Sequence, residues 1–197
     1  MADGSLAEAA FRHYLVQDYL FLIEFARAYA LSVYKSPKLA DMREAAAGLS
    51  AILDVEMNLH VKLCAGWGLS PSDLNNPLRR SRCWPIHATC STRECAAISW
   101  HLRWRLPCVI GYAEIATRLA SRPDAHAATN PYRVWIAEYA GAPYQEVAAK
   151  ARAHLEGLAD LYATPAREAE LIVIFKEAIR LEADFWEMGW RADQRVE

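Results

Sequence analysis

The chain has 197 residues, of which 54% are hydrophobic and 23% are charged. That composition is typical of a folded globular protein and excludes a largely disordered chain. Lysine and arginine (22) nearly balance aspartate and glutamate (24), so the net charge of -2 gives no electrostatic case for binding nucleic acid. A chain of this length can fold around one hydrophobic core, and we expect a single domain over residues 1–197.

The N-terminal residues lack the charged start and the apolar run of a secretory signal. No apolar stretch approaches the roughly 20 residues that a membrane-spanning helix needs. We therefore expect a soluble, cytoplasmic protein that does not bind membranes. The five cysteines are an odd number, which fits free thiols in a reducing compartment better than a disulfide framework.

Glycine and proline fall mostly between long runs rich in Ala, Leu, Glu and Arg, which is the pattern of helices joined by short loops. The pattern predicts an all-α bundle of about seven helices, with no strand-like alternation. Two long helices come first, and the second is expected to end at Gly66 and Gly68. The predicted helices cover about residues 6–33, 39–65, 88–105, 107–119, 131–139, 143–162 and 165–191.

Residues 79–105 are atypical of the rest of the chain. They contain three Cys, three Trp, two His and six Arg, and their apolar positions follow no helical period. We favour the interpretation that this stretch was translated out of frame, because wrong-frame reading of GC-rich DNA tends to give Arg, Cys, Trp and Ser together. The alternative is a zinc site, although structural zinc sites usually contain closely spaced Cys pairs. Its ligands would be Cys83, Cys90 and Cys95 with His87 or His101.

Three predicted helices each carry one carboxylate on an otherwise apolar face, namely Asp18, Glu56 and Glu182. A buried carboxylate is costly unless it is paired or hydrogen-bonded. One explanation is that each carboxylate only orders the core. Aromatic neighbours favour a pocket in which rings stack on a planar heterocycle and carboxylates accept its N–H protons. The positions that share these faces are Tyr14, Phe21, Phe25, Ile52, Leu59, Leu63, Phe175, Ile179 and Trp186.

Cys108 is a candidate nucleophile. It follows a proline at a predicted helix start, so we expect it in the first turn, where the helix dipole and free N–H groups favour a thiolate. Tyr112, Ile115 and Leu119 are expected to share its inward face. A cysteine on an apolar face is more often core filler, and we keep that interpretation for Cys64, which precedes a glycine-rich helix end.

Several segments, in family order, resemble motifs of the TenA/thiaminase II family, which has the heme-oxygenase-like α-helical fold. They span most of the chain, so the combination is more specific than any one of them. The segments are Tyr14–Leu22 (YLVQDYLFL), Val55–His60 (VEMNLH), Leu106–Glu114 (LPCVIGYAE), Trp135–Tyr139 (WIAEY) and Glu182–Trp186 (EADFW).

The resemblance implies an enzyme that hydrolyses thiamin-derived aminopyrimidines. The implied reactions are conversion of 4-amino-5-aminomethyl-2-methylpyrimidine to the hydroxymethyl form in thiamin salvage, and thiaminase activity. The family's cysteine adds to the pyrimidine, a glutamate protonates the departing amine, and water resolves the adduct. The resemblance implies that the protein is a homotetramer. It implies no metal or organic cofactor. It assigns catalysis to Cys108 and Glu182, and substrate binding to Asp18, Tyr112, Tyr139, Phe21 and Phe185.

The sequence departs from the family pattern in three places. Phe21 stands where several members have a tyrosine, which removes a hydroxyl but keeps the ring. The family has a further helix ahead of the position matched by Ala2, so we expect a shortened N-terminus. In residues 79–105 the family has a helix with a pocket tyrosine, and this sequence has no tyrosine there. These departures allow a weakly active enzyme.

Two alternatives stay open. The first is an oxidative enzyme of the same fold, either cofactor-less or di-iron, in which Glu56, His60 and Glu182 would bind iron. A di-iron bundle site uses Glu and His three residues apart on two helices, whereas Glu56 and His60 are four apart. The second is a non-catalytic pyrimidine-binding or regulatory protein, although no helix-turn-helix or basic recognition helix is apparent.

Overall fold

The structure is a computed structural model that describes residues 1–36, 38–74 and 107–192. All regular elements within those ranges are helices, which confirms the predicted all-α class. None of the described helices is both long enough and apolar enough to cross a membrane. The elements are α1 (Glu8–Lys35), α2 (Leu39–Ser50), the π-helix η1 (Ala51–Glu56), α3 (Met57–Gly66), α4 (Pro71–Leu74), α7 (Tyr112–Ala120), the 3₁₀ helix η4 (Pro123–His126), α8 (Arg133–Ala140), α9 (Ala142–Tyr162) and α10 (Pro165–Trp190).

The described chain forms two compact units. The first contains residues 1–7 and 107–183, and the second contains residues 8–36, 38–74 and 184–192. The long helix α10 contributes residues to both. The single-domain assignment stays a prediction, and the predicted helix over 88–105 and the alternative zinc ligands lie outside the described residues.

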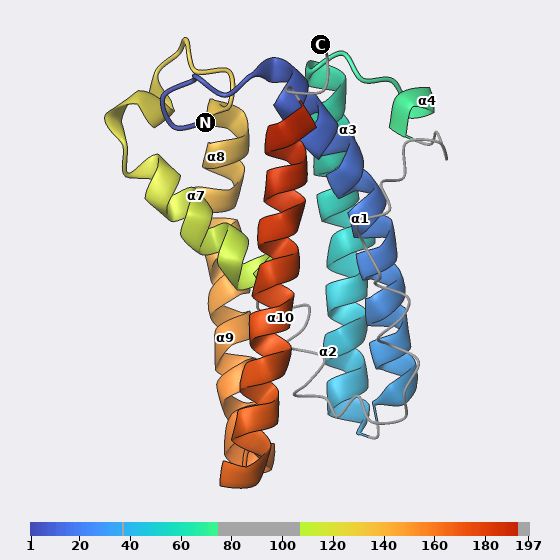
Figure 1. The fold of residues 1–197 in the computed structure, drawn as a ribbon. Coiled ribbons are helices and arrows are strands. Elements are labelled where there is room, and N and C mark those ends of the chain that lie inside the picture. The colour runs from blue at the N-terminus through green and yellow to red at the C-terminus, as the bar shows by residue number, and fades with distance from the viewer. Residues whose placement is uncertain (37, 75–106, 193–197) are drawn as a thin grey trace. The chain divides into compact units, whose positions relative to one another are not determined.

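In the second unit, α1 packs along the rod formed by α2, η1 and α3 (Figure 1). The sequence predicts one uninterrupted α-helix over 39–65, but the Met57 N–H bonds the Ile52 carbonyl five residues back. Such a wide π turn shifts every later side chain around the helix axis. Glu56 and Leu59 are half-buried rather than inward as predicted, while Ile52 and Leu63 are buried as predicted.

The predicted end of this rod is confirmed. Gly68 has a φ of +71°, a conformation that glycine adopts without steric cost. The Leu69 N–H bonds the Cys64 carbonyl at 2.9 Å and the Gly68 N–H bonds the Ala65 carbonyl at 3.0 Å. This pair of bonds is the Schellman motif, which satisfies carbonyls that the helix leaves free at its end.

The inward face of α1 forms the core of the second unit. Tyr14, Asp18, Phe21 and Phe25 are all buried, as their spacing predicts. A cysteine from α3 completes this region: the Cys64 side chain is 0% exposed. Burial, and secondarily the negative charge of Asp18, raises the pKa of the Cys64 thiol to about 12. This thiol stays protonated and packs as an apolar group, which confirms its predicted core role.

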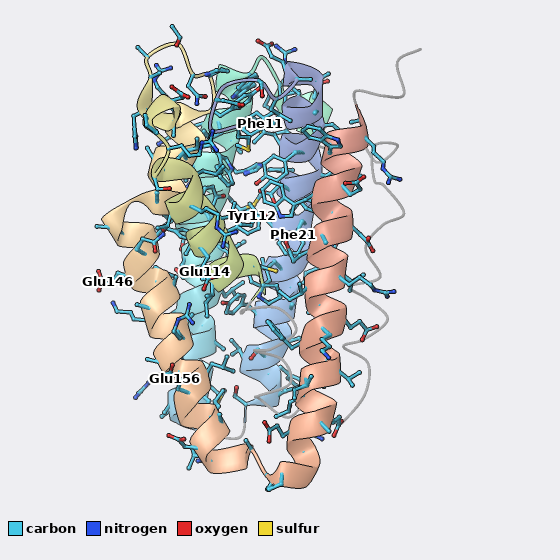
Figure 2. The ribbon with its side chains drawn as sticks, turned by 60° about the vertical axis from the view of Figure 1, so that its left-hand side comes forward. Phe11, Phe21, Tyr112, Glu114, Glu146 and Glu156 are labelled. Carbon is cyan, nitrogen blue, oxygen red and sulfur yellow. The ribbon has the colours of Figure 1, made fainter. Side chains whose placement is uncertain are left out.

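In the first unit, α7 packs on α8, and the start of α9 contacts both. Residues 107–111 form a π-helical turn that leads into α7. The buried face of α7 is therefore Tyr112, Ala113 and Ala116, whereas Ile115 is 37% exposed and the prediction that it points inward is wrong. The outer face of α9 is charged, with Glu146 and Glu156 pointing outward (Figure 2).

The N-terminal residues are fixed to the loop before α8 by Asn130. Its buried side-chain amide donates to the carbonyls of Met1 and Ala2 at 3.0 Å and of Asp124 at 3.2 Å. Its side-chain oxygen accepts the Tyr132 N–H at 2.9 Å. One buried amide thus satisfies the polar groups of two otherwise irregular segments.

The N-terminal part of α10 packs against α9 through Leu171 and Leu158. The buried positions of this part are Leu171, Ile174 and Ala178. Ile179 is 43% exposed, so the predicted stripe through it is wrong. Two of these buried positions lie one residue before a position of the predicted stripe, Ile174 before Phe175 and Ala178 before Ile179.

Two glycines on helices are expected to respond in opposite ways to the same change. A Cβ on Gly48 would lie 2.3 Å from Cε1 of the buried Tyr29 ring, whereas nothing lies within 4 Å of a Cβ on Gly157 in α9. We expect Gly48→Ala to destabilise the protein by about 1–3 kcal/mol through overpacking. Gly157→Ala should stabilise it by about 0.5–1 kcal/mol through helix propensity. Urea unfolding of both variants measures this, and shifts of the same sign would contradict the packing described.

Raising the pH is expected to destabilise the protein through Cys64. Its pKa of about 12 in the folded protein exceeds the value of about 8.5 for a thiol in an unfolded chain. As the pH rises, the thiol of the unfolded chain therefore loses its proton before the thiol of the folded protein does. The contribution of Cys64 to the free energy of unfolding is complete below about pH 8.5 and falls by ~1.4 kcal/mol per pH unit as the pH rises toward 12. Urea unfolding at about pH 8 and about pH 10 should show the stability gap between wild type and Cys64→Ala shrinking by about 2 kcal/mol. A constant gap would show that Cys64 titrates normally.

Candidate functional site

The first unit brings the predicted nucleophile to the predicted acid/base residue. Cys108 lies in the π-helical turn before α7 and is buried, and Glu182 on α10 is half-buried. The Cys108 thiol donates a hydrogen bond to Oε1 of Glu182, with 3.2 Å between Sγ and the oxygen. Because 74 residues separate the two in sequence, this contact is created by the fold. The carboxylate is within reach to accept the thiol proton, as an activated nucleophile requires.

Side chains at the start of α9 hold the backbone around this pair. The Tyr144 hydroxyl donates to the Cys108 carbonyl over 3.4 Å. Nε2 of Gln145 donates to the carbonyls of Ala113 at 3.1 Å and Tyr139 at 2.9 Å. These bonds tie the Cys108 turn, α7 and α8 to the start of α9, which holds the backbone at the thiol in place. Sequence reasoning missed Tyr144, because only the fold reveals that contact.

An aromatic cluster lies on the helices that follow Cys108. Tyr112 and Tyr139, both predicted to bind substrate, are buried with ring centroids 5.5 Å apart. Trp135 lies 4.6 Å from Tyr139, and the Tyr144 ring meets Tyr139 edge-on at 4.8 Å. Such rings offer both flat apolar surface and hydroxyl groups, which suits a polar heterocycle.

The second unit contains the predicted pyrimidine-holding residue. Asp18 on α1 is 3% exposed. The Tyr14 hydroxyl, one turn earlier, donates a hydrogen bond of 3.1 Å to Oδ2 of Asp18. Nδ1 of the buried His60 lies 3.5 Å from the same oxygen. A hydroxyl donor and an imidazole therefore surround one carboxylate oxygen, which offsets part of the cost of burying it.

Sequence reasoning noted His60 beside Glu56 but did not pair it with Asp18. A signal was available: both lie on apolar faces of long helices, one acidic and one basic. Helical periodicity places a residue on a face but does not say which residue of another helix it meets. The residue grouped with His60 from the sequence was Glu56, but Glu56, at the end of the π-helix η1, is half-buried whereas His60 is buried.

The aromatic residues predicted beside Asp18 are also found in the second unit. Phe21 and Phe185 are buried, with ring centroids 6.2 Å apart (Phe21 is labelled in Figure 2). Tyr14 stacks on Trp186 at 5.0 Å with an angle of 13° between the rings. The hydroxyl of Tyr14 and the flat ring of Trp186 extend the predicted set of residues.

The predicted site residues thus fall into two sets. Cys108, Glu182, Tyr112 and Tyr139 belong to the first unit, and Asp18, Phe21 and Phe185 belong to the second. Within residues 1–36, 38–74 and 107–192, no three His, Cys, Asp or Glu side chains gather so that they could hold a metal ion. The chemistry available in the first set is that of a thiol beside a carboxylate. Whether Cys108 lies in the first turn of its helix depends on residues before 107, which lie outside the described ranges. That placement stays a prediction.

Comparison with known proteins places these residues in a family context. An aminopyrimidine aminohydrolase of Halalkalibacterium halodurans is 31% identical over 193 residues, which cover 96% of this chain and 84% of that protein. A candidate hydroxymethylpyrimidine/phosphomethylpyrimidine kinase of Schizosaccharomyces pombe is 35% identical over 191 residues. That match covers 95% of this chain but only 34% of the longer kinase.

A solved structure and a family match agree with the sequence relatives. A protein of Silicibacter sp. described as a TenA family transcription regulator has a TM-score of 0.75 and 33% identity, and the match covers 95% of this chain and 84% of that one. Residues 1–192 match the TENA/THI-4/PQQC family. The resemblance inferred from the sequence motifs is confirmed, and the chain belongs to the TENA/THI-4/PQQC family.

Proposed function

We propose that the protein hydrolyses an aminomethyl-aminopyrimidine derived from thiamin, releasing ammonia and the hydroxymethyl pyrimidine. The observation that carries the proposal is the 3.2 Å hydrogen bond from the Cys108 thiol to Glu182. A thiol paired with a carboxylate is the minimum needed for nucleophilic catalysis with general acid–base assistance. The aminopyrimidine aminohydrolase of H. halodurans, at 31% identity, supports this class of substrate.

Cys108 and Glu182 can complete a balanced catalytic cycle with water as the only reactant besides the substrate. Glu182 accepts the thiol proton as Cys108 Sγ adds to the pyrimidine, and then gives that proton to the departing amine, which leaves as ammonia. Water next adds to the adduct, and Glu182 takes its proton. The carbon–sulfur bond then breaks, the proton returns to sulfur, and the hydroxymethyl product is released. Splitting one displacement into two steps in this way lowers each barrier.

Asp18 is proposed to hold the pyrimidine. Its buried carboxylate is an acceptor for the exocyclic amino group, and the Tyr14 hydroxyl fixes its orientation. Phe21 and Phe185 in the unit of Asp18, and Tyr112 and Tyr139 in the unit of Cys108, are proposed to supply flat rings on which a heterocycle can stack. Thiaminase activity on thiamin itself would use the same groups, with the thiazole as the leaving group.

Variants of the two catalytic residues test the proposal. Cys108→Ala should abolish ammonia release from 4-amino-5-aminomethyl-2-methylpyrimidine, because no sulfur remains to form the adduct. Glu182→Gln should lower kcat by about 100-fold or more, as expected for loss of a general acid–base group. Cys64→Ala is the matched control, since that thiol is buried and protonated, and it should retain ammonia release. Loss of activity in Cys64→Ala but not in Cys108→Ala would overturn the assignment.

A non-catalytic binding protein is the second candidate, favoured by the description of the Silicibacter relative as a transcription regulator. Calorimetric binding of the hydroxymethyl pyrimidine separates the two candidates when it is measured beside ammonia release. An enzyme should both bind the pyrimidine and turn over its aminomethyl form. Binding without turnover by the folded wild-type protein would favour the regulatory role.

A further inference from the structure

His60 is a buried histidine whose two ring nitrogens face different partners. The residue lies on α3 and is 1% exposed. Its Nε2 lies 2.7 Å from the backbone carbonyl of Leu15 in α1. A carbonyl oxygen can only accept, so Nε2 carries a proton. With a proton on Nε2, the ring is neutral if Nδ1 carries no proton and is an imidazolium if Nδ1 carries one.

The other nitrogen, Nδ1, is buried and makes no hydrogen bond that meets normal geometry within the described residues. Oδ2 of Asp18 lies 3.5 Å away from it. If the ring were neutral with its proton on Nε2, the lone pair of Nδ1 would face the carboxylate oxygen. Two acceptors facing each other away from water are costly. A proton shared between Nδ1 and Oδ2 removes that cost.

Neighbouring groups favour placing this proton on His60 and the negative charge on Asp18. The Tyr14 hydroxyl donates to Oδ2 of Asp18 at 3.1 Å, and a donor to a carboxylate favours its ionised form. One turn after His60, the thiol of Cys64 stays protonated because burial raises its pKa. It therefore does not compete as an anion for the imidazolium.

We propose that His60 is a positioning residue for Asp18, forming a buried imidazolium–carboxylate pair anchored on the Leu15 carbonyl. His60 keeps the carboxylate charged and oriented, so that it can accept the amino group of an aminopyrimidine. The inference rests on the proposed function for its ligand, but the pairing itself exists in the free protein. A buried pair in which the charges compensate is the arrangement that a buried carboxylate requires.

Nitrogen NMR of the free protein tests the pairing without any ligand. The His60 ring signals are identified by their loss in His60→Gln. At neutral pH the wild type should show protons on both ring nitrogens, whereas Asp18→Asn should show a proton on Nε2 alone. A wild-type ring without a proton on Nδ1 would overturn the proposal. If His60→Gln folds poorly, the His60 signals are identified instead as the ring signals that change between the wild type and Asp18→Asn.

Calorimetric binding tests the positioning role. The probes are 4-amino-5-hydroxymethyl-2-methylpyrimidine and the same pyrimidine without its 4-amino group. His60→Gln should weaken binding of the first at least about tenfold, as expected for a charge-assisted hydrogen bond, and should change binding of the second little. In an Asp18→Asn background, His60→Gln should cause no further loss, because His60 acts through Asp18. The control is His126→Gln, which removes an exposed histidine that also bonds a backbone carbonyl and should alter neither affinity.

The outcomes separate the inference from the proposed function. Equal weakening for both pyrimidines, with helicity unchanged by circular dichroism, would mean that His60 only packs the core and would overturn the positioning role. If the wild type binds neither pyrimidine, the proposed function fails and the positioning role fails with it. The NMR comparison would still decide whether Asp18 and His60 share a proton.

Discussion

A carboxylate that is shielded from water needs a hydrogen-bond donor, and each unit of the protein contains one such pairing. In the first unit Glu182 accepts the Cys108 thiol, and in the second Asp18 accepts the Tyr14 hydroxyl beside His60. Each pairing joins elements that are distant in sequence or lies at the centre of an aromatic cluster. The groups that satisfy buried polarity are therefore the same groups that we propose to act on the substrate.

The two described cysteines show how local surroundings, rather than residue type, decide the role of a thiol. Both Cys64 and Cys108 are buried and free of disulfides. Burial and the charge of Asp18 keep Cys64 protonated, which suits a core position. Cys108 instead donates directly to a half-buried carboxylate and lies on a turn braced by Tyr144. Only the second arrangement gives the thiol proton a place to go, which is what nucleophilic chemistry needs.

Much of the fold could be predicted because helical periodicity and glycine carry a direct physical meaning. The buried face of α1 around Asp18 follows from the 3.6-residue period, and the end of α3 follows from the αL conformation of Gly68. The errors concern which side chains of a helix face the core, and they occur at two π turns and on α10, where Ile179 is exposed. Residues 51–56 and 107–111 form π turns, which no sequence period announces. Glu56, in the first of them, is less buried than predicted, and Ile115, one turn after the second, is exposed.

The residues proposed for the site could be named from the sequence, but their pairings could not. Cys108 and Glu182 could each be singled out as a reactive or ionisable group on an apolar face, yet their contact spans 74 residues and depends on tertiary packing. The bond from His60 to the Leu15 carbonyl spans 45 residues and was missed for the same reason. Family resemblance supplied the roles, while the geometry supplied the partners that make those roles chemically reasonable.

Intact-protein mass spectrometry of the wild type, quenched with acid during turnover of the aminomethyl pyrimidine, tests the central claim most directly. The account predicts a mass increase equal to the substrate less one ammonia, located by digestion on the peptide that contains Cys108 and absent from Cys108→Ala. Steady ammonia release with Cys108 unmodified at every time point, or an adduct on Cys64 instead, would contradict it.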